Sequence, residues 1–145
     1  MGWKRLCILT TLLATLLLTA ATAAAQDYSF TLDQENVEVW INDDGTVDLE
    51  YWLTFTCDPG AHPIDVVDLG LPNNTYNRST IRATIDGQPV DSIGSDYQGQ
   101  GTGVAVWLGD NIQPGTSGTV YVSVPGLEDM LYEDTEDDDY ASIEF

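Results

Sequence analysis

Two tryptophans and two glutamates are the residues whose types and spacing best fit a binding task. Trp40 and Trp52 share one face of a period-two pattern with Glu38 and Glu50. Aromatic rings among acids stack on sugars or bind cations, so these four residues are the candidate ligand site. The alternative is that the rings pack under a loop or against a following domain. The two glutamates also suggest glycoside hydrolysis, but that chemistry needs one carboxyl in an apolar setting, which a solvated strand face lacks.

Metal-binding and catalytic motifs give weaker signals. Asp137, Asp138 and Asp139 are calcium candidates, although the D-x-D-x-D-G spacing of a calcium loop is missing. His62 and Cys57 are too few for a zinc site, and the sequence has no hydrolase, phosphate-loop or dinucleotide motif. We therefore expect no catalytic residue and no enzyme activity. We also expect no cofactor, with calcium as the alternative.

Residues 1–25 have the composition of a secretory signal peptide. A positive start at Lys4 and Arg5 precedes an apolar stretch, and small residues that end at Ala25 follow it. We expect cleavage before Gln26, with an uncleaved membrane anchor as the alternative. The apolar stretch is short for a bilayer span, which favours cleavage. The rest of the chain is therefore expected to be extracytoplasmic.

The chain is strongly acidic. Its 145 residues carry 24 Asp and Glu against 4 Lys and Arg, a formal net charge of −20. Without residues 1–25, two arginines face the same 24 acids, and the net charge becomes −22. Phosphate contacts need clustered Lys and Arg, so we expect no nucleic-acid partner. Cys57 would be the one remaining thiol, and its place in an apolar alternation predicts a buried, inert side chain.

The residues after position 26 alternate between apolar and polar types, which is typical of strands with one buried face. Residues 37–41 and 47–55 flank a three-residue loop that ends at Gly45. A hairpin loop of this length fixes three apolar pairs: Ile41 with Val47, Val39 with Leu49, and Val37 with Tyr51. This register puts the apolar residues on one face and sets Glu38 opposite Glu50. A slip by one residue would bury Asp48.

Further strands are expected where the alternation continues between turn residues, at residues 64–69, 80–85, 104–108 and 120–124. Asp86-Gly87, Pro114-Gly115 and Pro125-Gly126 are the turn signals. About seven strands without a helical period predict an all-β protein, an antiparallel immunoglobulin-like β-sandwich. Residues 26–126 would form this domain. Residues 127–145 are expected to be an acidic linker and the start of a further strand, at which the chain is truncated.

The order of these features resembles a known domain. It runs through Asp44-Gly45, Leu71-Pro72, Ile85-Asp86-Gly87 and Leu108-Gly109-Asp110. Over about residues 27–125 the chain resembles the N-terminal extracytoplasmic β-sandwich domain of a bacterial predicted membrane-protein family of unknown function. It departs from that pattern at residues 57–71, which contain no arginine. The resemblance implies transmembrane helices beyond Phe145 and brings no catalytic residues.

Together these observations predict an exported, non-catalytic β-sandwich, the ectodomain of a surface or envelope membrane protein with a structural or interaction role. Its partner would be a protein or glycan at the cell surface, and its membrane anchor would lie in a downstream segment. One alternative is a carbohydrate- or cation-binding module that uses Trp40, Trp52 and Glu50. A second alternative is an accessory domain of a larger hydrolase.

Overall fold

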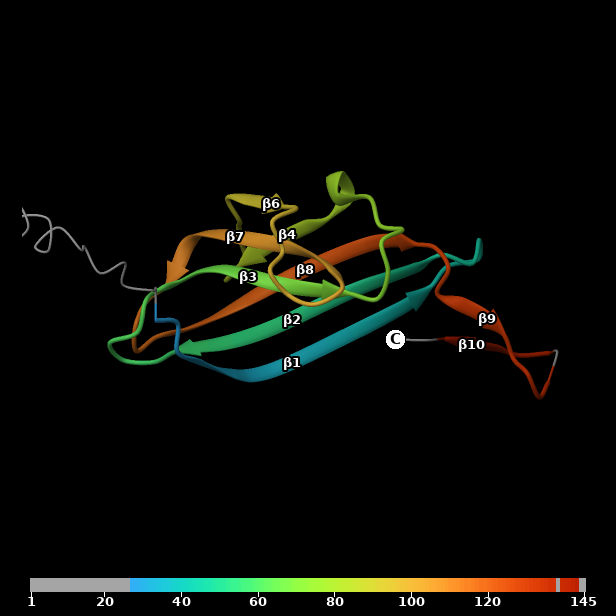
Figure 1. Ribbon diagram of the computed structural model, residues 1–145, viewed down its shortest axis with the longest axis horizontal. Helices are drawn as coiled ribbons and strands as arrows, with labels where there is room; N and C mark the ends of the chain where they lie inside the picture. Colours follow the sequence, from blue (N-terminus) through green and yellow to red (C-terminus); the bar gives the residue numbers. More distant parts are fainter. Residues whose placement is uncertain (1–26, 138, 144–145) are drawn as a thin grey trace, which may run out of the picture.

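Strands make up most of the computed structural model, which describes residues 27–137 and 139–143 (Figure 1). Strand content is 59% against 3% helix. The one helical element among the described residues is a short 3-10 turn at Arg78–Thr80. All strand pairs are antiparallel. The predicted signal peptide at residues 1–25 lies outside the described residues.

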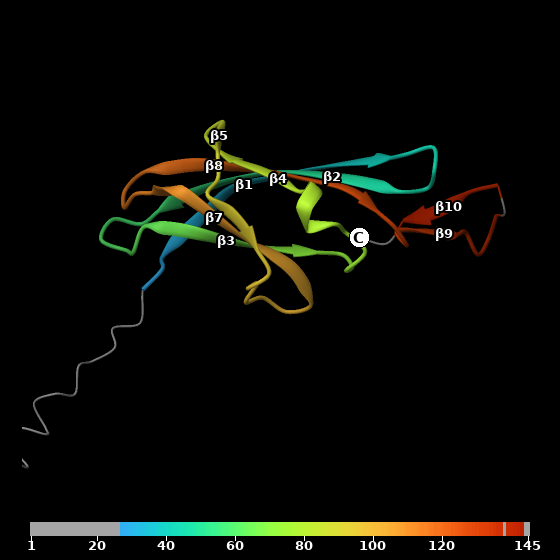
Figure 2. The ribbon, with the colours of Figure 1, turned by 90° about the horizontal axis from the view of Figure 1, so that it is seen from above.

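Two sheets make up the sandwich. The first has the order β1-β2-β8-β4-β5, with β1 Phe30–Ile41, β2 Val47–Cys57, β8 Ser117–Leu127, β4 Arg82–Ile85 and β5 Gln88–Pro89. The second has the order β3-β7-β6, with β3 Ile64–Leu71, β7 Thr102–Ile112 and β6 Ser92–Gly94. Figure 2 shows the two sheets as separate layers. The all-β antiparallel sandwich predicted from the sequence is confirmed.

The core lies between the two layers and is built by alternation. Alternate residues of β2, from Val47 to Cys57, are buried, and the residues between them face outward. Val104, Val106 and Leu108 of β7 contribute to the core from the other sheet. The side chain of Cys57 is fully buried, as predicted. Its thiol donates to the carbonyl of His62 at 3.4 Å.

The hairpin between β1 and β2 has the predicted register. Ile41 pairs with Val47, Val39 with Leu49, and Val37 with Tyr51. Gly45 has a φ of +83°, the left-handed conformation that the turn requires. The Asn42 N–H donates to the carbonyl of Thr46 at 2.9 Å and closes the loop.

The apolar face of β1 differs from the expectation, because it is largely exposed. Phe30 is 50% exposed, Leu32 42%, Val39 42% and Ile41 61%. The cause is the width of the second sheet. Its three strands cover β2, β8 and β4, and β1 lies clear of them at the side of the sandwich (Figure 1).

The bounds of the strands also differ from those predicted, at Thr80 and at Pro125-Gly126 among other places. Thr80 belongs to the 3-10 turn, because the Asn77 side chain caps that turn by accepting from the Ser79 N–H. Pro125-Gly126 does not end β8, which continues past an irregularity to Leu127. Leu127 and Met130 are buried, so the packed core extends beyond residue 126.

The acidic segment after the sandwich contains a hairpin of β9 (Leu131–Glu133) and β10 (Ala141–Ile143). It projects from one end of the molecule in both views (Figures 1 and 2). β10 lies where a further strand was predicted. The structure thus has eight strands in its two sheets and two in this hairpin, counted over the described residues, against about seven predicted.

Candidate functional site

The four predicted ligand residues share the outer face of β1 and β2. Glu38 lies opposite Glu50, as the register predicted. Trp40 pairs with Asp48 and is 57% exposed, whereas Trp52 pairs with Asn36 and is half-buried. The two tryptophans therefore lie on either side of the glutamate pair. They do not form one continuous aromatic platform.

The aromatic neighbour of Trp52 is Tyr121 of β8. Their ring centroids are 5.1 Å apart at an interplanar angle of 44°. The Tyr121 hydroxyl donates to Oε1 of Glu50 at 2.9 Å. Burial and this hydrogen bond raise the pKa of Tyr121. The alternation of residues 120–124 indicates that Tyr121 points outward. It does not indicate that β8 lies beside β2.

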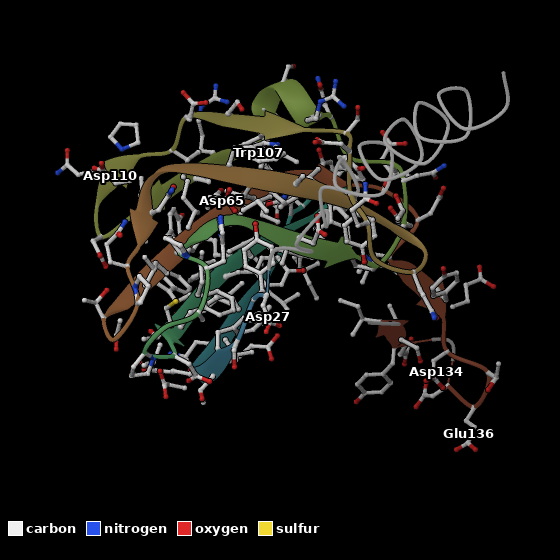
Figure 3. The ribbon with its side chains drawn as sticks, turned by 60° about the vertical axis from the view of Figure 1, so that its left-hand side comes forward. Asp27, Asp65, Trp107, Asp110, Asp134 and Glu136 are labelled. Carbon is white, nitrogen blue, oxygen red and sulfur yellow. The ribbon has the colours of Figure 1, made fainter. Side chains whose placement is uncertain are left out.

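Trp107 on β7 is an example of the alternative to ligand binding, a tryptophan that packs under a loop (Figure 3). Its side chain is half-buried, and its Nε1 lies 3.5 Å from Oδ1 of Asp96, in the loop that follows β6. This ring packs under a loop, which is the outcome that the sequence left open for the tryptophans. It therefore does not add to the candidate ligand site.

A groove along the open side of the sandwich was not predicted. It lies between β1, the edge of the first sheet, and β3, the edge of the second. Its two hollows measure about 280 and 440 Å³. They are lined mainly by apolar side chains: Tyr28, Phe30, Leu32, Val37, Tyr51, Leu53, Phe55, Ile64, Val66, Val67, Leu69 and Pro72. We call this feature the open groove.

One end of the open groove is closed by contacts between its two sides. The Tyr28 hydroxyl donates to Oδ1 of Asp65 at 2.5 Å. The rings of Tyr28 and His62 pack edge to face, with their centroids 5.1 Å apart. The hydrogen bond to Asp65, with burial and the carboxylate charge, raises the pKa of Tyr28 to about 12. Figure 3 shows Asp65 on β3 and Asp27 just before β1.

Carboxylates stand on both sides of the open groove. Glu35 comes from the inner face of β1, where it pairs with Leu53, and Asp68 comes from β3. Burial and the charge of Glu35 raise the pKa of the Tyr51 phenol to about 12. None of the residues that line the two hollows is basic. The groove is therefore apolar and negatively charged.

Two of the predicted calcium residues, Asp137 and Asp139, lie in the turn of the β9–β10 hairpin. The Asp139 N–H donates to Oδ1 of Asp137 at 3.1 Å, and the Asp137 N–H donates to Oδ1 of Asp134 at the same distance. These carboxylates thus accept from the backbone of their own turn. Asp138 lies outside the described residues. Within residues 27–137 and 139–143, no group of three or more His, Cys, Asp or Glu is placed to hold a metal ion.

Over the same ranges, the structure has no helix with the length and apolar character of a bilayer span. The chain was also compared with known proteins. No protein-family model, no curated protein and no solved structure matches it.

Proposed function

We propose that the chain is an exported, non-catalytic β-sandwich with an interaction role, and that it binds its partner along the open groove. The observation that carries this proposal is the row of exposed apolar side chains on β1 beside an apolar hollow. Contiguous apolar surface of this kind usually marks an interaction site. The proposal includes the immunoglobulin-like class of the sandwich, the signal peptide, and the place of the domain as the ectodomain of an envelope or surface protein.

A photo-crosslinking side chain tests the binding surface in the cells that produce the protein. We would place it at Leu32, in the open groove, and in a matched variant at Glu50, on the outer face. Cross-linking to a partner from Leu32 alone is the expected result. Cross-linking from Glu50 alone would favour the outer face, and cross-linking from neither position would contradict an interaction role.

Export has its own test. The protein would be recovered from the extracytoplasmic fraction and its N-terminus sequenced. We expect a chain that begins at Gln26. A chain that keeps residues 1–25 in the membrane fraction would instead support the uncleaved anchor.

The second candidate function is carbohydrate or cation binding at the outer face. The pair of Trp52 and Tyr121, with Glu50 held beside it, favours this hypothesis. A Trp52→Ala variant that loses every hit of the wild-type protein on a glycan array, while Trp107→Phe keeps them, would support it. The hypothesis of an accessory domain of a hydrolase has no such observation among the described residues.

A further inference from the structure

We infer that the partner of the open groove is an extended, positively charged segment of another protein, which adds to β1 as a new edge strand. This inference rests on the proposed function and names the class of partner. It depends on three features of β1: its unpaired backbone edge, its apolar inner face and the charge around it.

The backbone edge follows from the hairpin register. The Asn42 N–H donates to the carbonyl of Thr46, so the backbone N–H and C=O of Asn42 point toward β2. Hydrogen-bonded and non-hydrogen-bonded pairs alternate along an antiparallel ladder. Val37, Val39 and Ile41 therefore direct their N–H and C=O groups away from β2. β1 ends the first sheet, so this edge has no strand beside it in the described residues.

The inner face of β1 carries the apolar residues that a new strand would extend. Their side chains are Phe30, Leu32, Val37, Val39 and Ile41, on the side of the buried residues of β2. Alternate side chains of an added strand would lie beside this row and over the open groove. Main-chain hydrogen bonds would give affinity, and the groove would select apolar side chains at every second position.

The charge around β1 favours a basic segment. Asp33, Glu35 and Glu38 lie on β1, and Asp65 and Asp68 lie on β3. The two arginines among the described residues, Arg78 and Arg82, lie on the 3-10 turn and on β4. In the first sheet, β2 and β8 separate β4 from β1. Like charges opposed across strands repel, so a second copy of β1 is a poor partner. Lysine or arginine side chains beside the groove would meet only carboxylates.

The test uses a synthetic peptide of about eight residues in which Lys and Val alternate, with both ends blocked. Binding to the full chain would be measured by fluorescence anisotropy. Two control peptides keep the length: one replaces Lys by Glu, and one carries N-methyl groups on alternate backbone nitrogens. We expect each control to bind at least about tenfold more weakly. Equal binding of either control would overturn the inference.

Variants at the free edges of β1 and β3 show which of the two strands the peptide pairs with. Val39→Pro removes an outward N–H and leaves the β1–β2 ladder intact, whereas Val39→Thr keeps the N–H. On β3 the matched variant is Val66→Pro. Val66 pairs with Trp107, whose backbone C=O points toward β6, because it accepts from the Asp91 N–H. The backbone N–H of Val66 therefore points toward the free edge of β3. We expect Val39→Pro to weaken binding at least about tenfold and the other two variants to weaken it less than about twofold. Binding lost only in Val66→Pro would overturn the choice of β1.

A charge variant tests the acidic face of β1. Glu38 lies on the outer face, toward which the lysines of the peptide would point while its valines lie over the groove. Glu38→Gln should therefore weaken the peptide about two- to fivefold at low salt. Asp91→Asn, near the opposite edge of the second sheet, should leave binding unchanged. If none of these effects is seen while Leu32 still cross-links to a partner, the inference of a basic strand is wrong and the proposed function stands. A dimer of the wild-type protein that the Val39→Pro variant abolishes would identify a second copy as the occupant and overturn the inference.

Discussion

Tyr51 lies on the floor of the open groove, with its phenol buried near Glu35. Burial, and then the charge of Glu35, raises its pKa from 10.0 to about 12. Below about pH 10 the phenol is neutral in the folded and unfolded chains alike. Between about pH 10 and pH 12 only the unfolded chain ionises. We therefore predict that the free energy of unfolding falls over this window, by about 2 kcal/mol from Tyr51.

The Tyr51→Phe variant isolates this effect, because it keeps the buried ring and removes the ionising group. Denaturant unfolding at about pH 9 and about pH 12 should show a smaller fall in the variant than in the wild-type protein. The same fall in both proteins would show that Tyr51 does not contribute. Tyr132→Phe, at an exposed position on β9, serves as the control.

Single residues also show how far the site was predictable. The opposition of Glu38 and Glu50 followed from the sequence, because the loop ending at Gly45 fixes the register locally. The contact between Trp52 and Tyr121 did not, because it depends on which distant strand lies beside β2. The open groove was missed for a similar reason. Its lining comes from β1 and β3, which belong to different sheets.

β1 is an edge strand, and two of its features oppose self-association. Glu35 places a charge on its inner face, and the register shifts between Leu32 and Gln34. Both features discourage edge-to-edge pairing of strands. We predict that Glu35→Val promotes dimers, because it completes the apolar row of β1 while the backbone edge stays open.

Size-exclusion chromatography with light scattering, over a range of concentrations, measures this change. The dimer of Glu35→Val should appear at a concentration about tenfold lower than for the wild-type protein. Glu38→Val removes the same charge from the outer face and is the matched control. Equal dimerisation of the two variants would show that net charge alone prevents association.

Strands themselves were largely predictable, since alternation marks one buried face. Their ends were less so. β8 was expected to stop at Pro125-Gly126, yet the Gly126 N–H donates to Oδ1 of Asp48 at 2.7 Å and the strand reaches Leu127. Thr80 left its predicted strand because Asn77 caps a turn. Both outcomes depend on side-chain acceptors that a hydrophobic pattern does not include.

The whole molecule carries many like charges, with 24 acids against two arginines outside residues 1–25. Mutual repulsion destabilises the compact state, and salt screens it. We predict that the melting temperature rises by several degrees between about 10 mM and about 500 mM NaCl. Calcium chloride at matched ionic strength separates screening from binding. A much larger rise with calcium would indicate a specific site, and no rise with either salt would contradict the repulsion.

The order of strands in the first sheet has a mechanical consequence. β1 and β8 both run antiparallel to β2, so they point the same way, and β1 begins at the end of the sheet opposite to where β8 finishes (Figure 1). Tension applied at Phe30 and Leu127 would slide the strands past one another and load all the ladder bonds together. Tension applied at Phe30 and Cys57, which pair at one end, would break the bonds one at a time. Single-molecule pulling should therefore need a larger force in the first geometry than in the second.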